Sequence, residues 1–388
     1  MAEKEQVRFY ISCPPGLENC LAAECSKLGL NQPIKDNRPA SIANKITHDE
    51  LGGLEFSGEY TDIYRCNLHL RTASRISVRL GEFFAAAFSE LRKKASRLNW
   101  ETFIVPGQAV NVSVTCHKSR LYHSDAVAER VLGAINDHFG HTHKPIVSSP
   151  HGQLILVRLV NDLCTISIDS SGELLHKRGY RLETAKAPLR ETLAAGMILL
   201  SGWQNRAPLI DPFCGSGTVP IEAALIATHT PPGIAREFAF SKWPLFEESA
   251  WQSILQNARK AIMNNGLSLA GYDRDQGAIR AAESNAARGG MKGRISFAHQ
   301  PISELQPSAE PGWLITNPPY GVRTSTNHDL RDLYARFGSI LRQNFTGWNV
   351  GILSSDKRLA GNLGLPAPTN TFNLINGGLP VQFLLYHL

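Results

Sequence analysis

The sequence predicts an α+β region up to residue 169 and, after it, an α/β domain built on a doubly wound, mostly parallel sheet. The chain has 388 residues, of which 43% are hydrophobic, and at about 150 residues per domain this length corresponds to two or three domains. Strand and helix patterns are interleaved, with one hairpin signal, between residues 60 and 169. From residue 186 onward, short apolar runs are each followed by a helical pattern, which is typical of a parallel sheet.

The composition excludes several classes of protein. Charged residues make up 19% of the chain, too few for a disordered protein, and no apolar run reaches the roughly 18 residues of a membrane span. The first ten residues, MAEKEQVRFY, lack the apolar segment of a secretory signal. The seven cysteines form no Cys-x-x-Cys pair, so we expect neither a disulfide scaffold nor a zinc ribbon. These features predict a cytoplasmic protein.

The spacing of apolar residues predicts the elements of the α+β region. Alternating apolar residues predict strands at 76–80 and 110–116, and an apolar stripe over 84–98 predicts an amphipathic helix. A further helix is expected after Ser124, which is a candidate N-cap.

A hairpin and an ambiguous segment complete this region. Asn161-Asp162 separates the apolar runs 154–160 and 163–169 and predicts a β-hairpin. Residues 62–70 fit both a strand and a helix, because alternate residues are apolar while a second set has helical spacing.

Basic residues are concentrated between residues 60 and 130, where there are eleven Lys and Arg but only six Asp and Glu. Arg75 and Arg79 are expected on the polar face of the first strand, and Lys118 and Arg120 just beyond the second. Such a cluster attracts a phosphate backbone and releases its counterions on binding, which favours a nucleic-acid partner. A solvated basic surface without a partner is the alternative.

The α/β domain is predicted from four apolar runs and the helical patterns beside them. The strands are expected at 208–210, 267–272, 313–316 and 350–353, and the helices at 219–228, 276–288 and 330–342. In such a sheet, ligands bind at the carboxyl ends of the strands. The residues that follow each strand are therefore the candidate site.

The first strand leads into Asp211-Pro212-Phe213-Cys214-Gly215-Ser216-Gly217-Thr218, which opens a helix. Its glycines let the backbone pass close to a ligand, and the free N–H groups of the helix attract a carboxylate or phosphate. Because residue 220 is Pro and no Gly-Lys-Ser/Thr follows, neither the dinucleotide fingerprint nor the P-loop is present. The segment predicts a nucleotide-binding loop, with a purely structural turn as the alternative. Cys214 is expected to pack, since no general base lies beside it in sequence.

The second strand ends in Asp273-Arg274-Asp275. Asp273 follows the apolar run directly, and the two oxygens of its carboxylate match the paired hydroxyls of a ribose. A helix N-cap is the alternative role. Beside the glycine loop, ribose binding is the role that we expect.

The third strand ends in Asn317-Pro318-Pro319-Tyr320. The prolines stiffen the backbone and remove two donors, so the Asn317 amide oxygen and the nearby carbonyls form a rigid set of acceptors. These acceptors suit an exocyclic amino group. They orient its lone pair and stabilise the positive charge that develops on the nitrogen. Tyr320 is placed to stack on a flat base. The alternative is a proline-capped loop with a packed tyrosine.

In this order, the three motifs resemble those of class I S-adenosylmethionine-dependent methyltransferases that modify an exocyclic amino nitrogen. More narrowly, the chain resembles the bacterial large-subunit rRNA guanine-N2 methyltransferase family, including its THUMP RNA-binding domain. The segments that carry the resemblance are DIYRCNL (62–68), TCHKSRLYH (115–123), HKRGYR (176–181), APLRETLAA (187–195), FAFSKW (238–243) and NGGLP (376–380). The resemblance covers nearly the whole chain.

The resemblance implies an architecture. It implies a ferredoxin-like unit over 1–58, a THUMP domain over 59–169, and a methyltransferase domain over 170–388. The catalytic sheet would have seven strands with an antiparallel C-terminal strand, and the ambiguous segment 62–70 would be a helix.

The resemblance also implies roles for individual residues. S-adenosylmethionine would be bound by Asp211, Phe213, Cys214, Gly215, Gly217, Thr218, Asp273, Arg274, Ile302 and Asn317. Catalysis would involve Asn317, Pro318 and Tyr320. RNA would contact Arg75, Arg79, Lys118, Arg120, Tyr122 and His123.

Two positions depart from the family pattern. Pro301 stands where the family has an acidic residue that receives the adenine amino group, so we expect the Ile302 backbone N–H to hold the adenine, with Gln300 or His299 helping. Val322 replaces a family glutamate after the tyrosine, which removes one acceptor for the guanine N–H groups.

The sequence thus predicts a methyltransferase that acts on guanine N2 in 23S rRNA, with S-adenosylmethionine as cofactor. The alternatives are an adenine-N6 DNA methyltransferase, a glutamine side-chain methyltransferase, and an RNA-binding assembly protein with a vestigial methyltransferase fold. No metal is expected, because His138, His141 and His143 have no carboxylate or cysteine at a useful spacing.

Overall fold

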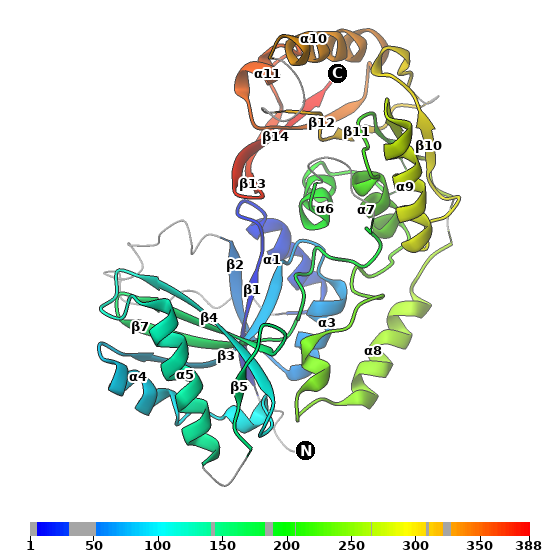
Figure 1. The fold of residues 1–388 in the computed structure, drawn as a ribbon. Coiled ribbons are helices and arrows are strands. Elements are labelled where there is room, and N and C mark those ends of the chain that lie inside the picture. Colours follow the sequence, from blue (N-terminus) through cyan, green and yellow to red (C-terminus); the bar gives the residue numbers. More distant parts are fainter. Residues whose placement is uncertain are drawn as a thin grey trace.

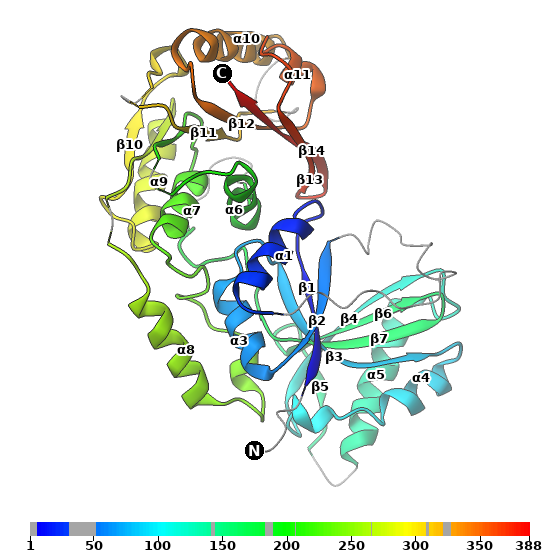
Figure 2. The same ribbon diagram turned by 180° about the vertical axis from the view of Figure 1, so that it is seen from behind.

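The computed structural model describes residues 6–30, 52–140, 144–182, 189–205, 207–264, 266–307, 310–320 and 327–388. Two seven-stranded sheets organise these residues, one in each half of the chain. Figures 1 and 2 show the two halves joined along helices α1, α3, α6 and α8.

The N-terminal half contains the first sheet, in the strand order β2-β1-β3-β7-β6-β4-β5. Its strands are β1 (Val7–Ser12), β2 (Gly53–Gly58), β3 (Arg75–Phe84), β4 (Ala109–His117), β5 (Val147–Ser148), β6 (Gln153–Val160) and β7 (Leu163–Asp169). Its helices are α1 (Glu18–Lys27), α3 (Tyr60–His69), α4 (Phe88–Ala95) and α5 (Ser124–Phe139). The two domains predicted here share this one sheet, and the boundaries at residues 58 and 169 remain predictions.

Most of the elements predicted in this half are confirmed. Residues 60–69 form a helix, α3, which decides the ambiguity of that segment. The hairpin of β6 and β7 turns at Asn161 and Asp162, whose φ angles of 51° and 65° are the positive values that a two-residue hairpin turn requires.

Two details of the predicted helices are wrong. The stripe predicted over 84–98 is a helix only from Phe88 to Ala95, because Phe84 pairs with Leu163 at the end of β3. Ser124 is the first residue of α5 rather than its N-cap, which is His123 with an extended backbone. Apolar spacing alone does not show where strand pairing ends and a helix begins.

The second half forms the α/β domain, with the strand order β10-β9-β8-β11-β12-β14-β13. Its strands are β8 (Leu209–Asp211), β9 (Leu269–Asp273), β10 (Ser296–His299), β11 (Trp313–Thr316), β12 (Asn349–Ser354), β13 (Asn370–Asn376) and β14 (Leu379–His387). Its helices are α6 (Glu191–Leu200), α7 (Thr218–Ala227), α8 (Glu248–Lys260), α9 (Gln276–Arg288), α10 (Asn327–Asn344) and α11 (Lys357–Gly361). Strands β8 to β12 pair in parallel and β14 runs antiparallel to both of its neighbours, which confirms the predicted fold class.

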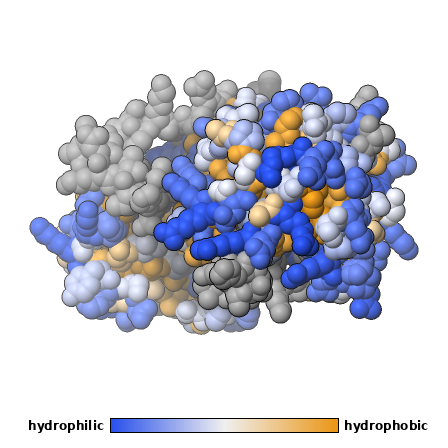
Figure 3. All heavy atoms as spheres, turned by 90° about the horizontal axis from the view of Figure 1, so that it is seen from above, coloured by the Kyte–Doolittle hydropathy of each residue, from blue (hydrophilic) through white to orange (hydrophobic). Residues whose placement is uncertain are grey.

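The sheet of the α/β domain is covered on both faces, as Figure 1 shows for α10 and α11 on one side and α6 and α7 on the other. On the α10 side the buried strand residues are Ile210, Leu314, Val350, Ile352, Leu384 and Tyr386. On the opposite side they include Leu209, Ile315, Leu353 and Phe383. The outer face of the α10 side carries mainly hydrophilic side chains (Figure 3). This double covering explains why these strands read as continuous apolar runs in the sequence.

The two halves are joined by buried polar contacts as well as by a common core. Arg71, at the end of α3, donates hydrogen bonds to the carbonyls of Leu225 and Thr230, at 3.1 and 2.8 Å. The Trp243 indole donates to Gln153 of β6 at 3.1 Å. Among the described residues, no helix is both long and apolar enough to cross a membrane.

Candidate active site

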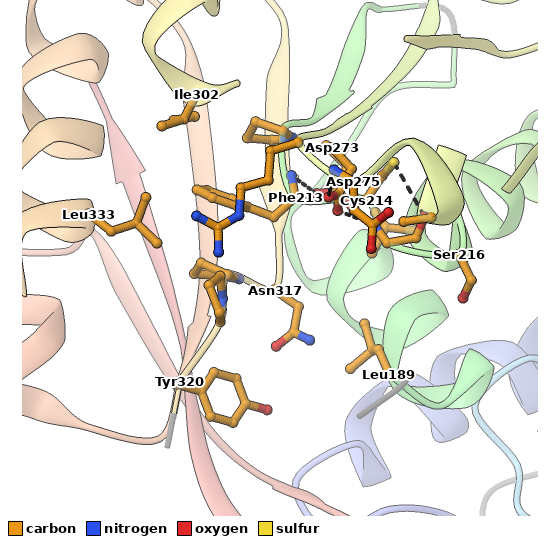
Figure 4. A pocket seen from close by; sticks show the side chains of 18 of the residues that line it. Leu189, Phe213, Cys214, Ser216, Asp273, Asp275, Ile302, Asn317, Tyr320 and Leu333 are labelled. Atoms are coloured by element: carbon orange, nitrogen blue, oxygen red, sulfur yellow. Dashed lines mark hydrogen bonds between the residues drawn. The ribbon is translucent and has the colours of Figure 1, made fainter. Parts of the chain in front are cut away.

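A cavity of about 2120 Å³ opens at the carboxyl ends of β8, β9 and β11. The order of the strands reverses between β8 and β11, and ligands of doubly wound sheets bind at such a point. Eleven of the predicted cofactor and catalytic residues line the cavity: Asp211, Phe213, Cys214, Gly215, Thr218, Asp273, Arg274, Ile302, Asn317, Pro318 and Tyr320. Figure 4 shows side chains from all three motifs directed into this common space.

Asp211 ends β8 and is buried at the floor of the cavity. Its carboxylate accepts hydrogen bonds from the Thr316 hydroxyl at 2.6 Å and from the Phe213 backbone N–H at 3.1 Å. Burial raises the pKa of Asp211 to about 7, although both hydrogen bonds favour the ionised form.

The glycine loop turns through two left-handed residues, Gly215 (φ 52°) and Gly217 (φ 82°). Gly215 lines the cavity and Gly217 does not, so the cofactor contact expected of Gly217 stays a prediction. A Cβ atom on Gly217 would lie 2.9 Å from the Cβ of Ala282 and 3.1 Å from the ring of Phe297. Gly217 therefore serves the turn and the packing behind it.

Asp273 links the glycine loop to the turn that follows β9, one carboxylate oxygen bonding each. Its Oδ2 accepts from the Gly215 N–H at 3.0 Å, and its Oδ1 accepts from the Asp275 N–H at 2.9 Å. Each carboxylate oxygen accepts about two hydrogen bonds, so both retain capacity for a ribose hydroxyl. The N-cap of α9 is Asp275, which accepts from the Gly277 N–H at 2.7 Å, so Asp273 does not have the alternative role of N-cap.

Cys214 contributes packing to the loop. Burial raises the pKa of its thiol well above the usual value, and its backbone N–H donates to the Tyr272 carbonyl at 2.9 Å. The phenyl ring of Phe213 packs edge-on against Phe337 of α10, with centroids 5.2 Å apart. A thiol with so high a pKa is a poor nucleophile, as the sequence predicts.

The Asn317 side chain projects into the cavity, on the side that faces Cys214 and Ser216 (Figure 4). Its Oδ1 atom is buried, yet no described residue donates a hydrogen bond to it. A buried acceptor without a partner costs about 1–3 kcal/mol, so it is retained where a ligand satisfies it. The described residues likewise provide no donor to the Pro318 carbonyl.

Tyr320 lies at the mouth of the same cavity, and its ring projects inward (Figure 4). Its hydroxyl accepts a hydrogen bond from the Asn376 amide at 2.9 Å. Burial raises the pKa of Tyr320, so the phenol is neutral at physiological pH.

The region around Pro301 matches part of the expected arrangement for adenine. Gln300, Pro301 and Ile302 line the cavity, whereas the His299 ring makes a 2.9 Å hydrogen bond with the Arg274 carbonyl. The Gln300 amide donates to the Glu304 carbonyl at 2.7 Å. No described residue accepts a hydrogen bond from the Ile302 backbone N–H, so this donor is available to a ligand. Val322 lies outside the described residues.

Several cavity residues were not predicted from the sequence. They include Leu189, Asp332, Leu333, Arg336, Asn376, Leu379 and Pro380. The three residues on α10 belong to an ordinary amphipathic helical pattern, so nothing in the sequence marks them as part of a site. The segment 376–380 does carry a signal, a glycine pair between two alternating apolar runs, but its position beside Tyr320 depends on the fold.

Two of the predicted RNA-binding residues are engaged within the N-terminal half. Arg75 pairs with the buried Asp169 at 2.5 Å, and Arg79 with Glu55 at 2.9 Å. These pairings reduce the charge available to a phosphate, so they lend no support to RNA contacts. The two assignments stay predictions.

The other four predicted RNA-binding residues share one exposed edge beyond β4. Lys118, Arg120, Tyr122 and His123 are all exposed, and the rings of Tyr122 and His123 lie 4.1 Å apart. Arg120 is 77% exposed and its Nε lies 3.7 Å from Asp162, a distance at which the pair is weak. This edge, residues 118–123, thus presents two cations beside two aromatic rings.

Within the described ranges, no group of three or more His, Cys, Asp or Glu side chains is placed to hold a metal ion. His138 contacts Glu101 at 2.7 Å and the Ser96 carbonyl at 3.0 Å. His141 and His143 lie outside the described residues.

Comparison with family models assigns each part of the chain. Residues 178–382 match the model described as RMKL-like, methyltransferase domain. Residues 8–77 match the RlmL ferredoxin-like domain, and residues 85–169 match the THUMP domain.

Individual relatives agree with these matches. A putative RNA methyltransferase of Synechocystis sp. is 32% identical over 98% of this chain and 96% of its own length. A ribosomal RNA large subunit methyltransferase K/L of Allochromatium vinosum is 35% identical over 98% of this chain, which spans 51% of that relative. The crystal structure of SMU.472, a putative methyltransferase complexed with S-adenosylhomocysteine, is 29% identical with a TM-score of 0.89, covering 99% of this chain and 98% of that one. With its ferredoxin-like and THUMP domains ahead of the catalytic sheet, the chain belongs to the RMKL-like methyltransferase family.

Proposed function

We propose that the protein is an S-adenosylmethionine-dependent RNA methyltransferase that transfers a methyl group to N2 of a guanine in 23S rRNA. The observation that carries the proposal is the buried Oδ1 of Asn317, which has no partner among the described residues and shares one cavity with the glycine loop and Asp273. A buried acceptor at this position suits an amino group brought next to a methyl donor.

The residues present fit S-adenosylmethionine. Ligand pockets are typically about 300–1,000 Å³, so a cavity of about 2120 Å³ leaves room for a target base beside a cofactor. Asp273 offers acceptor capacity for the ribose, and the Ile302 N–H, which no described residue engages, is a donor for the adenine. SMU.472, bound to S-adenosylhomocysteine, shares the whole fold. When bound, the cofactor supplies an electrophilic methyl group on a positively charged sulfur.

The protein's own residues position the acceptor nitrogen. Asn317 Oδ1 and the Pro318 carbonyl each accept a hydrogen bond from the amino group of the base. These two bonds fix the orientation of the amino group, so that the nitrogen lone pair is directed at the methyl carbon. With the cofactor bound, methyl transfer would leave the nitrogen positively charged until its extra proton is lost to water, and these two oxygens would stabilise that charge. Tyr320 stacks on the target base. To reach the site, the base leaves the stack of its RNA helix, at a cost of a few kcal/mol.

RNA as the substrate class is supported by the THUMP domain and by the exposed edge 118–123. Rings beside cations at such an edge suit phosphates and unstacked bases. The large-subunit rRNA is proposed from the K/L relatives, of which the chain spans about half. Guanine N2 is proposed from the resemblance of the motifs to the guanine-N2 family.

A side-by-side transfer experiment tests the proposal. Labelled S-adenosylmethionine is offered with 23S rRNA from cells that lack the protein, with plasmid DNA, and with a translation release factor. Label in the 23S rRNA, recovered by mass spectrometry as N2-methylguanosine, is the expected result. Label in DNA as N6-methyladenine, or in a glutamine side chain, contradicts the proposal. Failure of S-adenosylhomocysteine to raise the melting temperature contradicts it in favour of a vestigial site.

A further inference from the structure

A hydrogen bond joins Asn376 and Tyr320. Asn376 is the last residue of β13, 56 positions beyond Tyr320 in the chain, and its Nδ2 donates to the phenol oxygen at 2.9 Å. Both residues line the cavity. The bond therefore joins the loop after β11 to the turn between β13 and β14 at the mouth of the site.

This bond fixes the far end of the Tyr320 ring. The ring is half-buried and packs against hydrophobic residues of both clusters, and the hydrogen bond from Asn376 adds a fixed point at the hydroxyl that limits the remaining rotation about the side-chain torsions. The Asn376 amide anchors the hydroxyl, so the plane of the ring is set before a base arrives. A preorganised stacking surface reduces the entropy lost on binding.

The turn that carries Asn376 is held on both sides. Asn376 pairs with Leu379 at the end of the β13–β14 ladder, and β14 pairs with β12 in the sheet. On the other side, Gly16 of the N-terminal half is so close that a Cβ atom there would lie 2.1 Å from the Asn373 carbonyl oxygen and 2.9 Å from Leu374. Figures 1 and 2 both show β13 beside the start of α1. Strand β13, which ends in Asn376, is therefore paired on one side and closely packed against the N-terminal half on the other.

We propose that Asn376 is a positioning residue that sets the orientation of the Tyr320 ring for stacking on the target base. The proposal rests on the proposed function, because it assigns the stacked group to a base of RNA. Asn376 itself takes no part in the transfer and acts only through Tyr320.

A double-mutant cycle tests the coupling. Asn376→Ala is expected to raise KM for 23S rRNA at least fivefold with a smaller change in kcat, while the affinity for S-adenosylhomocysteine stays within twofold. In a Tyr320→Phe background, which lacks the hydroxyl, Asn376→Ala is expected to change KM by less than twofold. Equal effects of Asn376→Ala in both backgrounds, or none in either, would overturn the proposal.

Gln382→Ala is the matched control. The Gln382 amide donates to Asn373 at 2.9 Å on the same hairpin, and neither residue lines the cavity. This variant also loses one amide hydrogen bond, but its KM is expected to stay within twofold of wild type. A fivefold increase here would mean that general loosening of the hairpin, and not the contact with Tyr320, causes the effect.

A spectroscopic measurement keeps the proposal separate from the proposed function. In protein labelled with ¹³C at the tyrosine Cζ, the Tyr320 signal is assigned as the one absent from Tyr320→Phe. Asn376→Ala is expected to shift this signal and Gln382→Ala to leave it in place. An unshifted Tyr320 signal overturns the positioning role even if RNA is methylated. If the wild type methylates no RNA, the proposed function fails, and with it the assignment of Asn376 to a target base.

Discussion

The Thr316 hydroxyl donates a 2.6 Å hydrogen bond to the Asp211 carboxylate, and both residues are buried at the ends of adjacent strands. Asp211 ends β8 and precedes the glycine loop, whereas Thr316 ends β11 and precedes Asn317. This bond therefore fixes the cofactor side of the cavity relative to the amine side.

Thr316→Val tests this link. Valine has nearly the same shape as threonine but cannot donate, so the buried Asp211 oxygen loses a partner at a cost of about 1–3 kcal/mol. We expect a lower free energy of unfolding in urea and a lower kcat. Thr316→Ser, which keeps the hydroxyl, is the control. If valine and serine are equivalent in kcat, the hydrogen bond does not set the geometry of the site.

Asp211 gives the stability a predicted dependence on pH. Its pKa is raised from 3.8 to about 7 in the folded protein, so between these values the folded state holds a proton that the unfolded chain has lost. Ionisation of Asp211 therefore lowers stability as the pH rises through this interval, and the cost is complete above the folded pKa.

Asp211→Asn removes this cost and keeps an oxygen acceptor for Thr316. We expect its free energy of unfolding, relative to wild type, to increase by on the order of 2 kcal/mol between pH 5 and pH 8. Chemical denaturation of both proteins at the two pH values measures this difference. A constant difference would show that Asp211 does not titrate in this range.

Gly217→Ala is expected to destabilise the protein through crowding as well as strain. The left-handed backbone costs about 1–3 kcal/mol for a residue with a Cβ, and here that atom also meets Ala282 and Phe297. Gly290→Ala is the control, because Gly290 has a similar φ of 74° but open space around it. Thermal melting should show a larger loss for Gly217→Ala, together with weaker S-adenosylhomocysteine binding. Equal losses of melting temperature in the two variants would show that crowding by Ala282 and Phe297 does not contribute.

The exposed edge 118–123 is expected to bind RNA through charge. Replacing both Lys118 and Arg120 with Ala should weaken RNA binding and reduce the slope of log K against log salt by about 1 per lost phosphate contact. Affinity for S-adenosylhomocysteine should not change. Lys260→Ala, an exposed lysine at the end of α8, is the control. Unchanged RNA affinity in the double variant would exclude this edge from the RNA interface.

The sequence predicts most of the catalytic half because its signals are local. Helix α9 has the predicted bounds, and the strand-loop-helix units follow from apolar runs that the sheet buries on both faces. The three loop motifs meet in one cavity because parallel strands bring their carboxyl ends together.

Contacts between distant segments are what the sequence does not predict. The partners of Arg75 and Arg79, Asp169 and Glu55, lie on other strands, so their charges look free in the sequence. Asn376 reaches Tyr320 only because β13 folds back beside the cavity. The close neighbours of Gly217, Ala282 and Phe297, come from other elements, so its packing role is visible only in the structure.

The most direct test of the central claim is Asn317→Ala, measured both for methyl transfer and for cofactor binding. If the Asn317 amide oxygen accepts the substrate amine and does not hold the cofactor, transfer to 23S rRNA falls by at least about 100-fold. Calorimetric titration should show affinity for S-adenosylhomocysteine within a few fold of wild type. Parallel loss of cofactor binding and transfer, or transfer close to the wild-type rate, would contradict this account.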